Sequence, residues 1–305
     1  MSRHEIATVL ETAMTAFTNG HADIALPIAF AGLNLGRKAL PADDWHEVIQ
    51  QVVAPHPVRT AVLADPMIRR ALEKPRGYAG DAVLLDYMYG LRRDEIAKVD
   101  HAGQRVHQFL VEGPAPSAVR HRLSVLADAL KRVGTRPEGP GRALALACGH
   151  LRELAQVPDA SWPREIVALD QDPESLAVVA SSYPDPRVVA RRGTVRDVLA
   201  RRLAGEPFDL VYAAGLFDYL DAPVATALTT RMFDLVAPGG HLLLANFTPD
   251  TPDIGFMEAI SEWHLVYRTE ADMWSLLEGI TAKTSARTWR DPGGCIVYLE
   301  VERVR

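Results

Sequence analysis

A glycine and an aspartate, each placed after an apolar run, are the residues whose types and spacing best fit a ligand site. Gly149 follows the run that begins at Ala143, and Asp170 ends the next run about 20 residues further on. A glycine lets a ligand approach the backbone, and a carboxylate can accept hydrogen bonds from both hydroxyls of a ribose. This pair therefore predicts a pocket for a ligand that contains a nucleoside.

Two nucleoside cofactors compete for this pocket, a nicotinamide dinucleotide and S-adenosylmethionine. The dinucleotide motif needs three glycines, two of which admit and bind the pyrophosphate. Here Leu151 and Arg152 stand where the further glycines would fall. S-adenosylmethionine has no phosphate and tolerates fewer glycines, so the sequence favours it and makes a dinucleotide oxidoreductase the weaker alternative.

The elements that must position these residues alternate in strand–helix order from residue 143 onward. Apolar runs predict strands at 143–148, 166–169, 188–191, 210–213, 241–246, 286–289 and 295–301. Helical patterns separate most of them, beginning with a predicted helix at 152–155, and this alternation indicates a parallel sheet covered on both faces. The Asp-Pro-Gly-Gly turn at 291–294 is too short for a parallel crossover, so it predicts a C-terminal antiparallel hairpin.

The chain before this region is predicted to be helical. Ile6, Val9 and Leu10 have the i, i+3, i+4 spacing of one helix face. The segment 73–81, EKPRGYAGD, contains a proline and two glycines and should form a loop. Residues 113–116 are the best candidate linker, so the predicted domains are residues 1–115 and 116–305.

Five segments of the second region, taken in order, resemble the class I S-adenosylmethionine-dependent methyltransferases. They are ALACGHL, ALDQD, RGTVRDV, FDLVYAAGLFDYL and LVAPGGHLLLANF. The resemblance implies a Rossmann-like fold and S-adenosylmethionine as the cofactor. The chain departs from the family in the glycine motif, where Ala145 replaces the usual acid and Ala147 and Leu151 replace two usual glycines.

A narrower resemblance covers nearly the whole chain. EKPRGYAGDAVLLDYMYG, LALACGHLREL, GLFDYL and ANFTPDTPDIGFMEAISEWHLVYRTEADM are similar to bacterial methyltransferases of the extracellular-factor 3-hydroxypalmitic acid methyl ester group. This resemblance implies carboxyl O-methylation. It also implies an α/β fold, in which an N-terminal helical lid domain precedes a Rossmann-like, seven-stranded, mostly parallel sheet with a C-terminal antiparallel hairpin.

Residue chemistry and the resemblance together predict the cofactor-binding residues. Asp170 is assigned to the ribose, because Asp172, before Pro173, already fits the role of helix N-cap. Thr194 and Val195 lie in the loop that faces adenine in the family, and a plain helix start is the equal alternative. The predicted set is Arg76, Tyr78, Cys148, Gly149, Asp170, Gln171, Thr194, Val195, Ala214 and Phe217.

Arg76, Tyr78 and Asp81 surround the two glycines of the loop at 73–81. We expect this loop to close over the cofactor as a lid, with Arg76 pairing with the methionine carboxylate. The alternative is an ordinary helix–helix connection with surface charges.

The predicted catalytic residues are Tyr219, Asn246, Trp263 and Arg268. Aromatic faces suit a positively charged sulfonium, and an arginine suits a carboxylate substrate. The alternative for Trp263 and Tyr267 is core packing of a cap helix, because they are i, i+4 neighbours. His150 and His264 are weak candidates for a general base, and no spacing fits a metal site.

These residues predict an S-adenosylmethionine-dependent methyltransferase that acts on a small molecule. One rival is a cyclase, in which the cofactor's own amine attacks its side chain and methylthioadenosine is released. Another is a non-catalytic S-adenosylmethionine-binding module. The net charge of −6 argues against nucleic acid as a partner. Two distant cysteines, with no signal peptide and no membrane-spanning run, predict a cytoplasmic protein. Nothing in the sequence indicates an oligomeric state.

Overall fold

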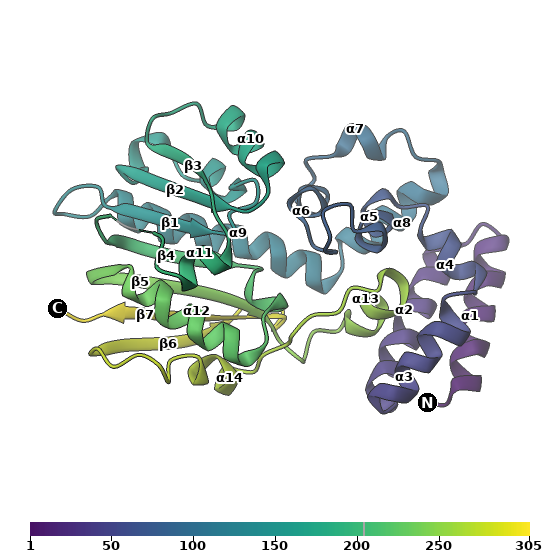
Figure 1. Ribbon diagram of the computed structural model, residues 1–305. Coiled ribbons are helices and arrows are strands. Elements are labelled where there is room, and N and C mark those ends of the chain that lie inside the picture. Colours follow the sequence, from purple (N-terminus) through teal and green to yellow (C-terminus); the bar gives the residue numbers. More distant parts are fainter. Residues whose placement is uncertain (204) are drawn as a thin grey trace. The chain divides into compact units, whose positions relative to one another are not determined.

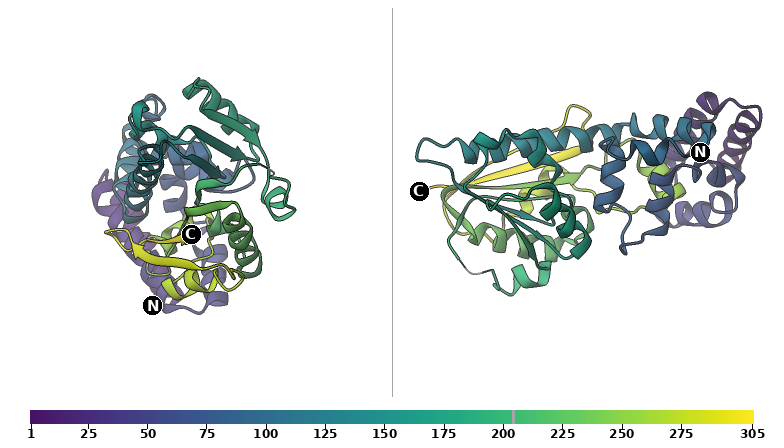
Figure 2. Two further views of the ribbon diagram at one scale, coloured as in Figure 1. Left: turned by 90° about the vertical axis from the view of Figure 1, so that its left-hand side faces the viewer. Right: turned by 90° about the horizontal axis from the view of Figure 1, so that it is seen from above.

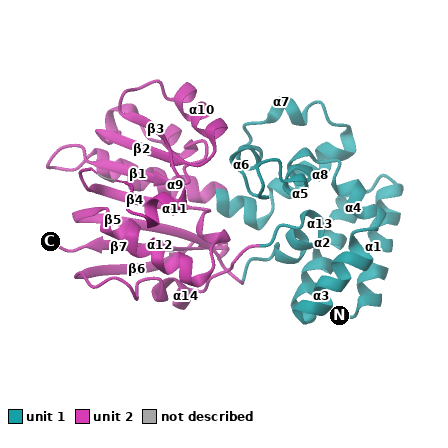
Figure 3. Cartoon of the chain, viewed as in Figure 1, with its two compact units in different colours: residues 1–119, 250–264 teal, residues 120–249, 265–305 magenta. Residues whose placement is uncertain are grey.

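The computed structural model describes residues 1–203 and 205–305, which form two compact units (Figure 3). Unit 1 comprises residues 1–119 and 250–264, and unit 2 comprises residues 120–249 and 265–305. The insertion 250–264, which the sequence analysis placed in the second domain, thus packs with the N-terminal helices.

Unit 2 is built on a seven-stranded sheet in the order β3-β2-β1-β4-β5-β7-β6 (Figure 1). Strands β1 to β5 pair in parallel, whereas β7 runs antiparallel to both β5 and β6. The predicted fold class, a mostly parallel sheet with a C-terminal antiparallel hairpin, is confirmed. The strands are β1 Arg142–Leu146, β2 Glu165–Asp170, β3 Val188–Arg192, β4 Phe208–Ala214, β5 Val236–Phe247, β6 Thr284–Arg290 and β7 Ile296–Arg303.

Helices cover both faces of this sheet, as its central strands require, because those strands are apolar on both sides. The helices α11 (Val195–Leu199), α12 (Ala222–Asp234) and α14 (Glu270–Ser275) share one core with β1, β4, β5 and β7. The second half of α9 (Pro114–Gly134) covers the other face (Figure 2). There, the Arg132 guanidinium donates a hydrogen bond to Glu300 of β7 at 2.6 Å. A further helix, α10 (Pro173–Ser182), packs on β2 and β3.

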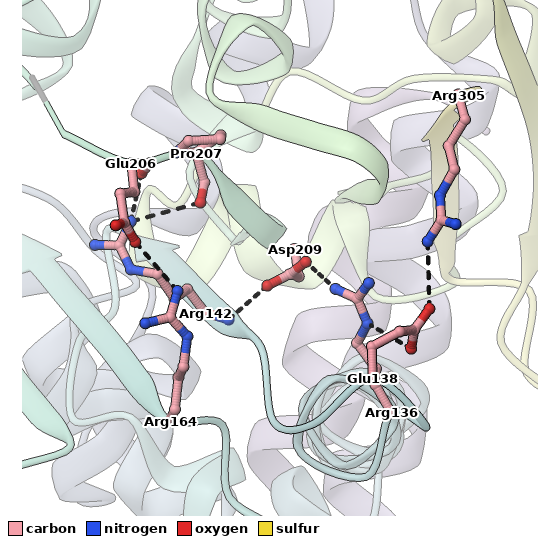
Figure 4. Close-up of polar contacts among 8 residues, drawn as sticks. All are labelled: Arg136, Glu138, Arg142, Arg164, Glu206, Pro207, Asp209 and Arg305. Atoms are coloured by element: carbon pink, nitrogen blue, oxygen red, sulfur yellow. Dashed lines mark hydrogen bonds and ion pairs between the residues drawn. The ribbon is translucent and has the colours of Figure 1, made fainter.

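The two edges of the sheet differ in what they carry. At the amino ends of β1 and β4, Asp209 accepts a hydrogen bond from the backbone N–H of Arg142 at 2.7 Å and pairs with Arg136 (Figure 4). Nearby, Arg305 bonds Glu138 at 3.2 Å. The carboxyl ends of β1, β2, β4 and β5 lie at the opposite edge, which is where parallel sheets of this kind bind ligands.

Unit 1 is helical, as predicted. Its elements are α1 Arg3–Thr18, α2 Ala22–Ala39, α3 Ala42–Val48, the π-helix Ile49–Val53, α4 Pro57–Val62, α5 Pro66–Glu73, α6 Ala82–Met88, α7 Arg93–Ile96, α8 His101–Val111 and α13 Ile254–Ser261. The helix α13 packs against α2. A Cβ added to Gly255 would lie 2.4 Å from the Leu33 carbonyl oxygen, and the Phe256 N–H donates to Asn34 Oδ1 at 3.1 Å. These close contacts explain why the insertion belongs to unit 1.

Two local predictions were wrong. Residues 113–116 are not a linker, because α9 begins at Pro114. Proline suits the first turn of a helix, where its missing N–H costs nothing, and the Ala115 N–H is capped by Asp253 at 3.2 Å. The helix expected at 152–155 is a 3₁₀ turn, Arg152–Gln156.

Candidate functional site

The loop after β1 has an unusual backbone. Ala147, Gly149 and Leu151 have φ angles of 54°, 53° and 52°, in the left-handed region. Only glycine adopts this conformation without steric cost, so two of the three residues are strained. Ala147 and Leu151 are the positions where the family resemblance expects glycines. Both non-glycine residues at these positions therefore adopt a conformation that favours glycine.

Asp170 lies directly beside this loop. The Gly149 N–H donates to its Oδ2 at 2.9 Å, and the Asp172 N–H donates to its Oδ1 at 2.9 Å. The side chain is buried, and each carboxylate oxygen retains a further lone pair for a ligand hydroxyl. Asp172 caps α10 through the N–H groups of Glu174 and Ser175, so Asp170 is not needed as the N-cap. The glycine and the acid that the sequence singled out are thus in contact.

The residues next to this pair offer mainly backbone groups. Burial raises the pKa of the Cys148 thiol well above its usual range, and Asp170 adds to the effect, so the thiol stays protonated. Gln171, directly after β2, has an exposed side chain.

The loop after β3 contacts the backbone of Asp170. The Gly193 N–H donates to the Asp170 carbonyl oxygen at 2.9 Å. Thr194 and Asp197 then form a capping box at the start of α11, in which Asp197 accepts from the Thr194 hydroxyl at 2.7 Å. These bonds to Thr194 lower the pKa of Asp197 to about 2. Thr194 therefore starts a helix, as the alternative predicted. Its contact with adenine, like that of Val195, stays a prediction.

The loop after β4 carries both buried and exposed residues of the predicted site. Ala214 ends the strand, and Gly215 turns the chain with a φ of 101°. The ring of Phe217 is fully buried in the core shared with α12, which leaves only its backbone for ligand contact. Tyr219 is 36% exposed and is the aromatic residue of this loop that remains accessible.

Asn246 and Arg268 form a buried hydrogen-bond network that holds this loop, called the lock below. Arg268 donates to Asn246 Oδ1 at 2.7 Å and to the carbonyl oxygens of Phe217 and Leu220 at 2.6 Å each. The Asn246 amide donates to the Val266 carbonyl oxygen at 2.8 Å. The guanidinium is thus directed at the loop, and this geometry favours a positioning role for both residues over direct contact with substrate.

Asp218 completes the lock. Its Oδ1 accepts from the Phe247 N–H at 2.7 Å, and its carbonyl oxygen accepts from the Val266 N–H at 2.7 Å. Burial raises the pKa of this carboxyl to about 6, although Arg122 and Arg268 act in the opposite direction. Burial likewise lowers the pKa of Arg268.

Three of the predicted residues belong to unit 1. Arg76 and Tyr78 are half-buried and flank Gly77, which is exposed and has a φ of 87°. The base of their loop is fixed, because Asp81 is buried, accepts a bidentate bond from Arg70 at 2.8 and 2.6 Å, and caps α6. The loop is thus anchored at Asp81, and its lid role stays a prediction.

Trp263 is the third, and its side chain is buried. This burial fits the alternative of core packing, but residues 263–267 do not form the cap helix that the alternative assumed. The helix α13 ends at Ser261, and Glu262 takes a left-handed conformation with a φ of 51°, so residues 262–269 are not helical. The two aromatic residues also fall in different units.

Arg122 was not among the predicted site residues. Arg122 is buried and lies on α9 between Val119 and Leu126, on the apolar side of the helix. A charged residue within an apolar helical stripe was the available signal, because such a residue rarely becomes buried without a specific partner.

Among residues 1–203 and 205–305, no group of three or more His, Cys, Asp or Glu side chains could hold a metal ion. In the same part of the chain, no helix combines the length and the apolar character needed to cross a bilayer.

Comparison with known proteins adds family information for unit 2. Residues 143–240, from β1 into β5, match the family described as Methyltransferase domain. The malonyl-[acyl-carrier protein] O-methyltransferase of Halalkalibacterium halodurans is 27% identical over 158 residues, which cover 50% of this chain and 55% of that protein. The chain thus spans about half the length of the curated relative it matches.

One solved structure with a TM-score above 0.5 shows the same fold. A candidate exported protein from Bordetella parapertussis has a TM-score of 0.57 at 20% identity, and the alignment covers 81% of this chain and 97% of that one. The magnesium protoporphyrin IX methyltransferase of Synechocystis PCC 6803, solved with bound SAH, has a TM-score of 0.48 at 15% identity, with coverages of 64% and 87%. Together with the fold, the match to a methyltransferase domain bears out S-adenosylmethionine as the predicted cofactor.

Proposed function

We propose that the protein is an S-adenosylmethionine-dependent methyltransferase that modifies a carboxylate of a small molecule, in secondary metabolism or signalling. The observation that carries this proposal is the contact between Gly149 and Asp170, within a region that matches a methyltransferase domain. It joins a left-handed turn to a carboxylate with free acceptor capacity, at the ligand-binding edge of the sheet.

The residues at this edge fit the cofactor. Asp170 would hold the ribose hydroxyls, the backbone around Gly149 would lie against the amino-acid part, and Thr194 with Val195 would face adenine. S-adenosylmethionine supplies a methyl group on positively charged sulfur, which an acceptor oxygen displaces while the sulfur keeps the electron pair. Tyr219 is the exposed aromatic residue suited to that positive charge.

A carboxylate acceptor needs no general base, since it is already ionised at neutral pH. The task of the protein is then to align the acceptor and to exclude water. The lock of Asn246, Arg268 and Asp218 would serve alignment by fixing the loop that carries Tyr219. Arg76 and Tyr78 would help to close the site, and Trp263 would contribute apolar surface.

Two observations support a carboxylate in particular. The curated relative is an O-methyltransferase of a malonyl group, and a malonyl group presents a free carboxylate. The resemblance to the 3-hydroxypalmitic acid methyl ester group also implies carboxyl methylation. The net charge of −6 disfavours nucleic acid as the acceptor. Cys148 and Cys295 form no disulfide in the described part of the chain, which fits a reducing cytoplasm.

A cyclase that releases methylthioadenosine is the second candidate. The observation that favours it is the altered glycine loop, in which Ala147 and Leu151 occupy left-handed positions near the expected place of the methionine amine. A non-catalytic S-adenosylmethionine-binding module is the third candidate.

One incubation separates the three candidates. The purified protein is given S-adenosylmethionine alone and then with a panel of carboxylic acids, and the nucleoside product is identified by mass spectrometry. S-adenosylhomocysteine that appears only with an acid supports methyl transfer. Methylthioadenosine without an acid establishes the cyclase, and binding without any turnover establishes the binding module.

The cofactor site is tested by Asp170→Ala. We expect it to weaken the binding of S-adenosylhomocysteine by about 1–3 kcal/mol, because the ribose hydroxyls lose a charged acceptor. Asp172→Ala is the matched control. It removes the N-cap of α10 and should lower stability by about 1 kcal/mol while the ligand still binds. Unchanged affinity in Asp170→Ala would remove that residue from the ribose site.

A further inference from the structure

Tyr298 on β7 has a buried hydroxyl that forms no hydrogen bond. The side chain is fully buried, and its Oη finds no partner among residues 1–203 and 205–305. An unsatisfied hydroxyl in a protein interior is costly and calls for an explanation, and a bound molecule or a catalytic role is among those it can have. The hydroxyl of Tyr212, on the same face of the sheet, instead donates to Glu153 at 2.6 Å.

The position of Tyr298 in the sheet places it near the ligand-binding edge. Strand register aligns Ala214 on β4, Ala245 on β5, Tyr298 on β7 and Trp289 on β6 in one row across the sheet. Ala214 and Ala245, the neighbours toward the centre, have short side chains. On the outer side, the Trp289 ring stacks on Tyr298 with centroids 5.1 Å apart. The tyrosine ring is therefore held in place beside two small residues.

A buried cation lies on the same side of the sheet. Arg122 projects from α9, which covers this face, and a Cβ added to Gly215 would lie 3.4 Å from its Nη1. The guanidinium is thus at the carboxyl end of β4, one residue beyond Ala214. Burial raises the pKa of Tyr298, with Arg122 acting in the opposite direction, so the hydroxyl stays protonated and can donate.

An O–H donor and a buried guanidinium on the same side of the sheet, both at the level of the carboxyl end of β4, can together receive a carboxylate. We propose that Tyr298 selects the acceptor by donating a hydrogen bond to one oxygen of its carboxylate, with Arg122 as the counter-charge. The other oxygen stays available to accept the methyl group. This inference rests on the proposed methyltransferase function, and it names a specificity residue that the sequence patterns did not indicate.

Tyr298→Phe isolates the hydroxyl. The variant keeps the ring that stacks on Trp289 and breaks no hydrogen bond to protein, so we expect it to fold as the wild type does. Acetate, malonate and 3-hydroxyhexadecanoate are titrated by calorimetry into protein saturated with S-adenosylhomocysteine. We expect the acid that binds best to lose about tenfold in affinity in Tyr298→Phe, while the affinity for S-adenosylhomocysteine is unchanged.

Tyr212→Phe is the matched control, because it removes a buried hydroxyl that is already satisfied by Glu153. It should lower the stability and leave acid binding unchanged. Equal acid affinity in Tyr298→Phe and wild type overturns the inference, as does the absence of binding by all three acids to the wild-type complex. If the wild type does not bind S-adenosylhomocysteine at all, the proposed function fails, and the inference fails with it.

Discussion

Strain in the loop after β1 is concentrated on single residues. Ala147 adopts a φ of 54°, which costs a residue with a Cβ about 1–2 kcal/mol. We expect Ala147→Gly to raise the free energy of unfolding by about 0.5–1 kcal/mol, because relief of the strain exceeds the extra entropy that glycine gives the unfolded chain. Urea unfolding followed by circular dichroism measures the change.

Leu151 is the matched control, since it has nearly the same φ of 52° but a fully buried side chain. Leu151→Gly should lower the free energy of unfolding by about 2–5 kcal/mol, because the lost packing outweighs the relieved strain. Destabilisation by Ala147→Gly would mean that the left-handed conformation is not kept in solution.

A second residue-scale prediction concerns Asp218. Burial raises its pKa from 3.8 to about 6 in the folded chain, so the folded state prefers the protonated carboxyl. Its stabilising contribution is complete below the unfolded pKa and is lost as the pH rises from about 4 to about 6. We expect Asp218→Asn, which still offers an oxygen to the Phe247 N–H, to remove this part of the pH dependence.

The measurement is the free energy of unfolding from pH 4 to pH 8 for the wild type and Asp218→Asn. Asp253, whose pKa burial also raises to about 6, is present in both proteins and cancels in the comparison. Parallel curves for the two proteins would show that the Asp218 carboxyl titrates normally.

At the scale of elements, the central strands could be predicted because burial on both faces fixes their apolar runs. The glycine and acid at the ends of β1 and β2 followed from the same pattern, since consecutive parallel strands deliver their carboxyl ends to one edge. The start of α9 was not predicted, because prolines at 114 and 116 suggest a linker. Prolines also fit the first turn of a helix, which is where the structure places them.

The lock around the loop after β4 could not be predicted, because it depends on contacts between distant segments. Asn246 and Arg268 were singled out for their chemistry, and only the structure places Phe217 and Leu220 around the guanidinium. Likewise, no sequence pattern distinguishes the unsatisfied hydroxyl of Tyr298 from the satisfied hydroxyl of Tyr212.

The lock also predicts a mutational effect on the loop. Arg268→Met leaves the Phe217 and Leu220 carbonyl oxygens and Asn246 Oδ1 without their donor, so we expect a loss of about 2–3 kcal/mol in stability. Hydrogen exchange should quicken in residues 217–220. Arg202→Met, which removes an exposed pair with Asp197, should change stability by less than about 0.5 kcal/mol. Equal exchange at residues 217–220 in wild type and Arg268→Met would show that the lock does not hold this loop.

At the scale of the whole molecule, the chain is folded as two units whose sequences interleave. Residues 250–264 leave unit 2 after β5 and return before β6, although they belong to unit 1. Periodicity alone predicts that this insertion contains a helix but not which unit buries it. The packing of Gly255 and Phe256 against α2 settles the question, and that contact joins residues more than 200 positions apart.

This interleaving predicts that unit 2 is not separable by a simple N-terminal truncation. All eight residues of α13 are buried, and deleting residues 1–119 removes the α2 surface against which they pack. We expect the truncated chain 120–305 to bind the dye ANS and to self-associate, measured by fluorescence and light scattering, because α13 then exposes a continuous apolar surface. The control is the same truncated chain with residues 250–264 replaced by a Gly/Ser linker of equal length, which should stay monomeric. A monomeric chain 120–305 that binds no dye would mean that α13 finds cover within unit 2 itself.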